Sequence, residues 1–332
     1  MDKSVTIKHV AKESGYSLAT VSRVVNGNQN VKPATRKKVV EVIEKLNYRP
    51  NAIARGLASK KTTTIGVVIP DIANVFFSSL ALGIDDVATM YKYNLIIANS
   101  DGIEEKEVNV LNTLLGKQVD GIIFMGHNLN DNIRAEFSRT RTPIVMAGTI
   151  DPDAQVASVN IDYTAATKDS TKKLVENGNE KVAFVTGPLI YPINGKERLS
   201  GYKQALKEEE LEFNEGFVFE ANYSFEDGQK VAERVHGSGA TAAVVTDDDL
   251  AAGLLDGLLE LGVKIPEEFE IIASNNSPIT KMLRPRLSSI SQPLYDLGAV
   301  SMRLLTKKMA GEEVEEKSIK LPYRIEKRGS TK

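Results

Sequence analysis

From Thr64 onward, short apolar runs rich in β-branched residues alternate with helical stretches. The runs are TIGVVIPD, NLIIANSD, DGIIFMG, PIVMAGT, KVAFVTGP, AAVVTDD and EIIASNN. Because both faces of each run are apolar, they predict parallel strands that helices bury on both sides. The pattern breaks near VASVNIDYTAAT, so we expect an α/β core of two open sheets with a ligand cleft between two lobes.

The first 48 residues follow a helical period instead. Within TIKHVAKESGYSLATVSRVVNG, two apolar faces stand on either side of a glycine: Ile7, Val10 and Ala11, then Leu18, Val21, Val24 and Val25. They predict two short helices joined by a tight turn at Gly15, with Thr6 and Ser17 as N-caps. A third helix is expected in KPATRKKVVEVIEKLNY. This is the helix-turn-helix plan, in which the second helix enters the DNA major groove.

The outward residues of the second helix fit that role. They are Leu18, Ala19, Thr20, Ser22 and Arg23. Arg23 can donate two hydrogen bonds to guanine, hydroxyls can bond several bases, and small apolar groups suit thymine methyls. Phosphates could be contacted by Asn30, Lys32, Arg36 and Lys37. The alternative is an ordinary amphipathic hairpin, and the lack of acidic residues from 14 to 38 argues against it.

The charges divide between the same two parts of the chain. Residues 1–61 carry 13 Lys and Arg against 4 Asp and Glu, whereas residues 62–332 carry 29 against 40. A basic module joined to an acidic one indicates that the N-terminal part meets a polyanion, although a solvated positive face is the alternative. Cysteine is absent and the three histidines are widely spaced, so a zinc enzyme is not expected. The N-terminus lacks a signal-peptide pattern, and no apolar run is long enough to span a bilayer. We therefore expect a cytoplasmic protein that does not bind membranes.

Residues 49–61 connect the two modules. The segment YRPNAIARGLASKKTTT is rich in alanine and could begin a helix at Pro50, but the run is too short for an isolated stable helix. We therefore expect a linker that forms a helix only when a binding event stabilises it. If two copies met on DNA, Leu57 would be an apolar wedge for a minor-groove base step, beside Ala58.

TIKHVAKESGYSLATVSRVVNG, followed by YRPNAIARGLASKKTTTIGVVIPD, resembles the headpiece, hinge helix and first core strand of the LacI/GalR repressor family. The resemblance implies a homodimer on a pseudo-palindromic operator, hinge helices that fold on binding, and a leucine inserted at the central step, here Leu57. It also implies a core similar to a periplasmic binding protein. The expected parts are a headpiece at 1–48, a hinge at 49–61 and a core at 62–332. Within the core we expect one lobe at about 62–161 plus 290–320 and another at about 162–289 plus 321–332.

The sequence carries no recognisable catalytic motif. The phosphate loop, the dinucleotide glycine motif and the nucleophile elbow are all missing. The three carboxylates at Asp247, Asp248 and Asp249 could be imagined as a metal site, but acids in the first turn of a helix favourably meet its dipole. We expect no enzyme, no cofactor and no metal; an α/β enzyme that carries a headpiece for its own regulation is the remaining alternative from another class.

Family members usually hold a small effector in the cleft, through an arginine in R-x-x-G-Y and an aspartate after a late strand. Arg198 in ERLSGY and Asp248 in TDDD fit the resemblance. Asn275 stands where many relatives have aspartate, and an amide offers only one acceptor and one donor group to a sugar hydroxyl pair, which weakens the expectation of tight sugar binding. The sequence leaves open whether glycolytic phosphates such as fructose bisphosphate occupy the cleft.

The segment QPLYDLGAVSMRLLTKKMAG offers a second input. Its apolar positions share one helical face, which leaves Asp296, Arg303 and Lys307 exposed, and the two cations can converge on one anion. Charge spacing alone favours a solvated face. The resemblance reverses this, since runs such as MYKYN and GKQVDGIIFM are similar to the branch of the family that governs carbon catabolite repression and holds serine-phosphorylated HPr at this helix. Tyr295, Asp296, Arg303 and Lys307 are then the corepressor contacts, and a sugar-inducible repressor controlled through the cleft is the alternative.

Overall fold

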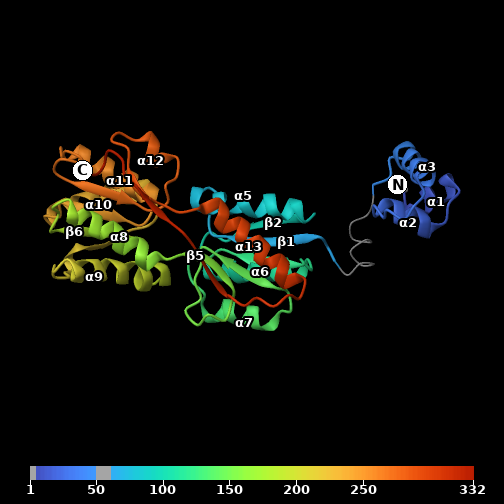
Figure 1. Ribbon diagram of the computed structural model, residues 1–332, viewed down its shortest axis with the longest axis horizontal. Coiled ribbons are helices and arrows are strands. Elements are labelled where there is room, and N and C mark those ends of the chain that lie inside the picture. The colour runs from blue at the N-terminus through green and yellow to red at the C-terminus, as the bar shows by residue number, and fades with distance from the viewer. Residues whose placement is uncertain (1–4, 50–60) are drawn as a thin grey trace. The chain divides into compact units, whose positions relative to one another are not determined.

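The computed structural model describes residues 5–49 and 61–332, and its contacts separate a first unit that ends at Thr63 from a second that begins at Thr64 (Figure 1). Within these described ranges, no helix combines the length and the apolar character that crossing a bilayer requires. Each unit has its own core, so each is described by itself.

The first unit is a bundle of three helices: α1 (Ile7–Ser14), α2 (Leu18–Val25) and α3 (Pro33–Lys45). Its core is made of the buried side chains of Val10, Val21, Val24, Val39, Val42 and Tyr48. Gly15 ends α1 at a φ of 73°, in the left-handed region that suits glycine, and Ser17 accepts the Thr20 N–H at 3.2 Å to cap α2. The predicted helix-turn-helix is confirmed.

The first lobe of the second unit is a six-stranded parallel sheet in the order β11-β5-β4-β3-β1-β2. Its strands are β1 (Thr64–Ile69), β2 (Asn94–Asn99), β3 (Gly121–Phe124), β4 (Ile144–Ala147), β5 (Ser158–Ile161) and β11 (Ser318–Leu321). Its helices are α5 (Val75–Met90), α6 (Glu104–Gly116), α7 (Asp131–Arg139) and α13 (Leu294–Met309). One apolar cluster joins α5 and α13 to the sheet and another joins α6 and α7 to it, so helices cover both faces.

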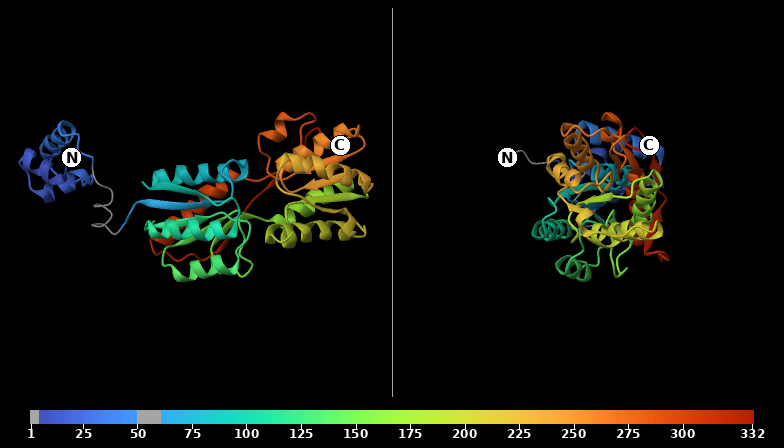
Figure 2. Two further views of the ribbon diagram at one scale, coloured as in Figure 1. Left: turned by 180° about the vertical axis from the view of Figure 1, so that it is seen from behind. Right: turned by 90° about the vertical axis from the view of Figure 1, so that its left-hand side faces the viewer.

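The second lobe is built in the same way, from a sheet with helices packed against it (Figure 2). Its strand order is β12-β10-β9-β8-β6-β7. Its strands are β6 (Val182–Thr186), β7 (Val218–Glu220), β8 (Ala242–Val245), β9 (Glu270–Ala273), β10 (Ser288–Ser291) and β12 (Arg324–Glu326). Its helices are α8 (Tyr163–Glu176), the π-helix η1 (Ile193–Arg198), α9 (Leu199–Glu208), the 3-10 helix η2 (Glu215–Phe217), α10 (Phe225–Gly237), α11 (Asp248–Glu260) and α12 (Ile279–Met282). Only β12 among these described strands runs antiparallel, against β10.

The chain passes between the two lobes three times. It crosses from β5 to α8, from β10 to α13 and from β11 to β12. The expected α/β core of two open sheets is confirmed, and both sheets are parallel except for β12.

One prediction about the strands is wrong. NLIIANSD was expected to be buried on both faces, but β2 is the edge strand of its sheet and Ile97 is 41% exposed. The apolar run alone does not reveal this, because a local pattern does not show that a strand has a neighbour on one side only.

Candidate functional site

The outer face of α2 presents the side chains predicted to read DNA. Leu18 is 45% exposed, and Ala19 and Arg23 are also exposed. Thr20 and Ser22 are half-buried and already bonded: Thr20 Oγ1 shares a 2.9 Å hydrogen bond with Ser17, and Ser22 Oγ accepts from the amide of Asn26 at 3.3 Å. Leu18, Ala19 and Arg23 are thus the freest groups on this face.

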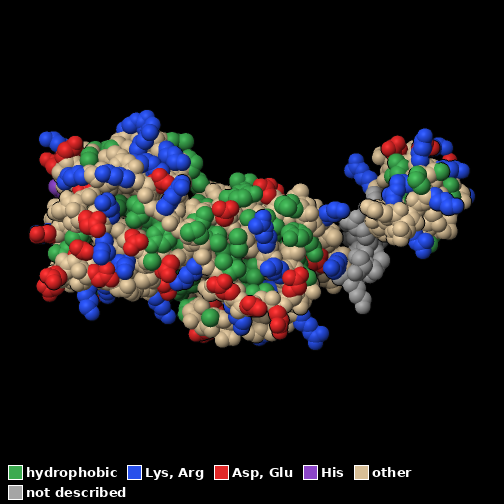
Figure 3. Space-filling model, in the orientation of Figure 1, with side chains coloured by type: hydrophobic (Ala, Val, Ile, Leu, Met, Phe, Trp, Pro, Cys, Tyr) green, Lys and Arg blue, Asp and Glu red, His purple; other side chains and the backbone are tan. Residues whose placement is uncertain are grey.

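The residues predicted to flank that face are also on the surface. Thr6 is the N-cap of α1, and its backbone N–H donates to Nδ1 of His9 at 3.0 Å. Asn30 and Lys37 are exposed, whereas the Arg36 guanidinium donates to the carbonyl of Asn28 and so ties α3 to the turn before it. Figure 3 shows Lys and Arg side chains distributed over the surface of this unit. Leu57 and Ala58 lie outside the described residues.

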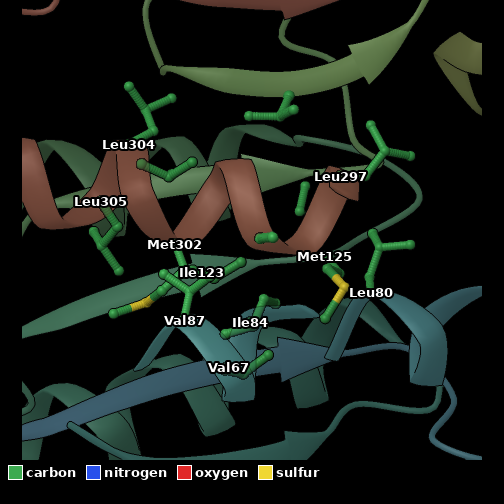
Figure 4. Close-up of a cluster of buried hydrophobic side chains, with 14 of the residues drawn as sticks. Val67, Leu80, Ile84, Val87, Ile123, Met125, Leu297, Met302, Leu304 and Leu305 are labelled. Atoms are coloured by element: carbon green, nitrogen blue, oxygen red, sulfur yellow. The ribbon is translucent and has the colours of Figure 1, made fainter. Parts of the chain in front are cut away.

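A second candidate site lies where α13 packs on α5. A Cβ added at Gly298 would stand 1.9 Å from the Leu80 carbonyl oxygen, and one at Gly83 would stand 2.0 Å from the Tyr295 carbonyl oxygen. Glycine at both positions therefore lets the two backbones touch. Beneath this contact, buried side chains of both helices interdigitate with those of the sheet, as Figure 4 shows for Leu305 and Val87.

The close contact creates a surface shared by both helices, which we name the α5–α13 face: Asp86, Tyr295, Asp296, Arg303 and Lys307. Tyr295 Oη donates to Asp86 Oδ2 at 2.8 Å and so bridges the helices. Asp296, Arg303 and Lys307 are exposed, and in the described part of the chain neither cation forms an ion pair. The arrangement leaves two cations, four residues apart, free to meet an anion.

The third candidate site is the cleft between the lobes. It contains a cavity of about 60 Å³, and its wall is formed by Asn74, Phe76, Phe77, Gly126, His127, Gly148, Tyr163, Tyr191, Ile193, Asn194, Arg198, Tyr223, Thr246, Asp247 and Asn275. Of the predicted cleft residues, Arg198 and Asn275 line this cavity. Asp248 does not: its carboxylate accepts the N–H groups of Ser274, Asn275 and Ser277, and so it holds the loop after β9.

Asp247 supplies the carboxyl of the cleft instead. It is the N-cap of α11, accepts the N–H groups of Asp249 and Leu250, and receives a 3.1 Å hydrogen bond from the Asn275 amide. Burial, with the nearby charge of Asp248, raises the pKa of Asp247 to about 7. A carboxyl that titrates near neutrality can present either a donor or an acceptor to the cavity.

Arg198 brings the opposite charge into the cleft. It is only 7% exposed, donates to the Asn194 side-chain oxygen at 3.2 Å and lies over the Tyr163 ring at 5.2 Å. Burial raises the pKa of Tyr163 to about 12, so its ring stays neutral beside the cation. The guanidinium has five N–H donors, and the hydrogen bond to Asn194 uses one of them. Arg198 can therefore also donate to an oxygen atom of a ligand in the cavity.

The sequence did not predict that aromatic side chains line the cavity. His127 lies in the loop after β3, and it lines the cavity together with Phe77, Tyr191 and Tyr223. Burial lowers the pKa of His127 to about 4, so the ring is neutral near pH 7. The available signal was that both MGHN and TGPLIYPINGK follow predicted strands, at the sheet edge where α/β proteins bind ligands.

Two family profiles match separate parts of the chain. Residues 6–51 match the bacterial regulatory proteins of the lacI family, and residues 171–331 match a periplasmic binding protein-like domain. The catabolite control protein A of Streptococcus mutans is 62% identical over 331 residues, which cover 100% of this chain and 99% of that protein.

Solved structures agree with these matches. The crystal structure of the transcription regulator CcpA of Lactococcus lactis superposes with a TM-score of 0.78 at 52% identity, over 81% of this chain and 99% of that one. The lac repressor dimer bound to operator and an anti-inducer gives a TM-score of 0.91 at 25% identity, over 99% of both chains. The relatives are transcription regulators and not enzymes, and the chain belongs to the LacI family of bacterial regulatory proteins, in the group of the catabolite control proteins A.

Proposed function

We propose that this catabolite control regulator binds pseudo-palindromic operator DNA as a homodimer, and that serine-phosphorylated HPr tightens this binding by docking on the α5–α13 face. The observation that carries the proposal is the pair of exposed cations on α13. Arg303 and Lys307 stand one helical turn apart, and neither forms a salt bridge with an acid in the described residues. Two such donors can hold the several oxygens of one phosphate.

The rest of the α5–α13 face suits a protein partner better than a free phosphate ion. Tyr295 is 47% exposed and offers an amphipathic ring, while Asp86 and Asp296 add negative charge beside the cations. A mixed pattern of both charges specifies the orientation of a docked protein surface, because like charges in a wrong orientation repel.

The headpiece supports the DNA part of the proposal. Leu18 and Arg23 project from the outer face of α2, on a unit that carries a strong excess of basic residues. The lac repressor, which has the same fold, is a dimer on its operator. We place Leu57 and Ala58 at the centre of the operator, as the family resemblance implies, although these two residues lie outside the described ranges.

The two sites would communicate through a shift between core arrangements. A partner that binds the closed arrangement more tightly raises its population, and the closed arrangement brings the paired hinges together before DNA arrives. Part of the free-energy cost of folding residues 49–61 is then met before the protein binds DNA.

The docking proposal is tested by charge reversal. Lys307→Glu should weaken the binding of serine-phosphorylated HPr roughly tenfold or more, because a charge-assisted hydrogen bond contributes about 1.5–3 kcal/mol. Lys207→Glu is the matched control, since Lys207 is also an exposed lysine in the last turn of a helix but lies on α9 of the other lobe. Calorimetric titration measures both. Equal losses in the two variants, or an unchanged affinity in Lys307→Glu, would contradict the assigned docking site.

A further inference from the structure

A row of aromatic rings crosses the cleft. His127 follows β3 in the first lobe and Tyr191 precedes η1 in the second, and their rings are stacked with centroids 4.7 Å apart and planes 15° apart. Behind His127, the Phe77 ring of α5 meets it edge-on at 5.7 Å and 72°. The ring of Tyr223, also from the second lobe, has its centroid 5.9 Å from that of His127, with the planes 37° apart. Rings from both lobes therefore meet in direct contact.

These contacts have the geometry that attracts aromatic rings. Stacked and edge-to-face pairs with centroids about 4.5–7 Å apart are favoured beyond the burial of their surfaces. His127 suits the position because burial holds its pKa well below neutrality, so the ring adds no buried charge to the stack. The contact joins loops of two different lobes, and it can exist only while those lobes are close.

The same rings line the cavity of the cleft. The cavity that remains beside them is about 60 Å³, which is well below the roughly 300–1,000 Å³ of ordinary small-molecule pockets. At about 10–15 Å³ for each water centre, it holds only a few waters. A sugar-sized molecule could enter only if His127 and Tyr191 separated.

We propose that the His127–Tyr191 stack takes the place of a small effector in the cleft and favours the closed arrangement of the core in the free chain, while leaving that population able to rise further. In an effector-controlled protein the ligand bridges two lobes and stabilises the closed arrangement; here the two rings make that bridge themselves. The inference goes beyond the proposed function, because it concerns the free chain and requires neither DNA nor a protein partner. It also gives a physical reason for control to reside on the outer surface of the core.

The distance between the lobes tests the proposal directly. The chain has no cysteine, so spin labels can be attached at Ser138→Cys on α7 and Glu233→Cys on α10, two exposed positions in different lobes. Pulsed electron resonance on the full-length protein, with doubly labelled chains diluted in an excess of unlabelled chains so that a dimer carries one labelled chain, should show a dominant short distance between the lobes. His127→Ala and Tyr191→Ala should each move a large part of the distribution to longer distances, whereas Tyr191→Phe, which keeps the ring, should leave it unchanged.

Two controls separate the stack from general destabilisation. Phe213→Ala removes a ring that packs edge-on against Tyr202 inside the second lobe, so it should not change the distance. Imidazole, which matches the ring removed in His127→Ala, should restore the short distance in that variant. Unchanged distances in both alanine variants with native circular dichroism, an equal change in Phe213→Ala, or an opened His127→Ala that ignores imidazole would each overturn the proposal.

Discussion

Gly298→Ala should disturb the α5–α13 face without touching any of its exposed side chains. The new methyl carbon would lie 1.9 Å from the Leu80 carbonyl oxygen and 2.8 Å from its carbon, and real contacts of this kind do not fall below 3.0 Å. The obstacle is backbone, so it cannot rotate away. The two helices would have to separate by about 1 Å, which loosens the layer of side chains that Leu305 and Val87 share.

The magnitude follows from two opposing effects. Overpacking a well-filled core costs about 1–3 kcal/mol, and a backbone obstacle belongs at the upper end of that range. Replacing glycine by alanine in a helix returns about 1 kcal/mol. The net loss of about 2 kcal/mol should lower the melting temperature of the core by about 4–8 °C.

Thermal unfolding followed by circular dichroism measures this change, with Gly116→Ala on α6 as the matched control. A Cβ at Gly116 meets nothing within 4 Å, so this variant should be neutral or slightly more stable. Because the Tyr295–Asp86 bridge depends on the spacing of the helices, Gly298→Ala should also bind serine-phosphorylated HPr more weakly. Equal stability of Gly298→Ala and Gly116→Ala would refute the reasoning about backbone contact.

Three further outcomes are expected. Arg23→Ala should cost about 1–3 kcal/mol in operator binding and relax base preference at one position in each half-site, measured by anisotropy on a set of altered operators; an equal loss on every sequence would remove its reading role. Leu305→Ala, at a fully buried position, should cost about 2–5 kcal/mol in urea unfolding, and a loss below 1 kcal/mol would contradict the described packing. The pKa of Asp247 rises from 3.8 to about 7 on folding, so this carboxyl should cost an increasing amount of stability as pH increases from about 4 to 7, and the stability of the wild-type chain relative to Asp247→Asn should fall across that interval. Parallel stability curves for the two proteins across that interval would count against the buried carboxyl.

Periodicity was sufficient to predict most of the fold. Short apolar runs on a background of helical stretches specify two parallel sheets, and the apolar stripes on either side of Gly15 specify the helix-turn-helix. The position of β2 at an edge and the reversed direction of β12 depend on pairings between distant segments, which a local pattern does not encode.

The cleft shows the same limit at the scale of single residues. Arg198 and Asn275 line the cavity, as expected from the resemblance, but the choice between Asp247 and Asp248 depends on the geometry of the α11 N-terminus. His127 and Tyr191 are separated by more than sixty residues, and only the folded core brings their rings into contact. Aromatic residues in loops follow no periodic pattern from which this ring contact could be predicted.

The most direct test of the account is fluorescence anisotropy with a labelled pseudo-palindromic catabolite operator at a fixed salt concentration. The protein is titrated alone, with HPr, with serine-phosphorylated HPr and with candidate sugars, and the series is repeated with Lys307→Glu. We predict that only the phosphorylated partner tightens binding and that Lys307→Glu loses this response while keeping its basal affinity. Indifference to phosphorylated HPr combined with release by a sugar would contradict the account and place control in the cleft.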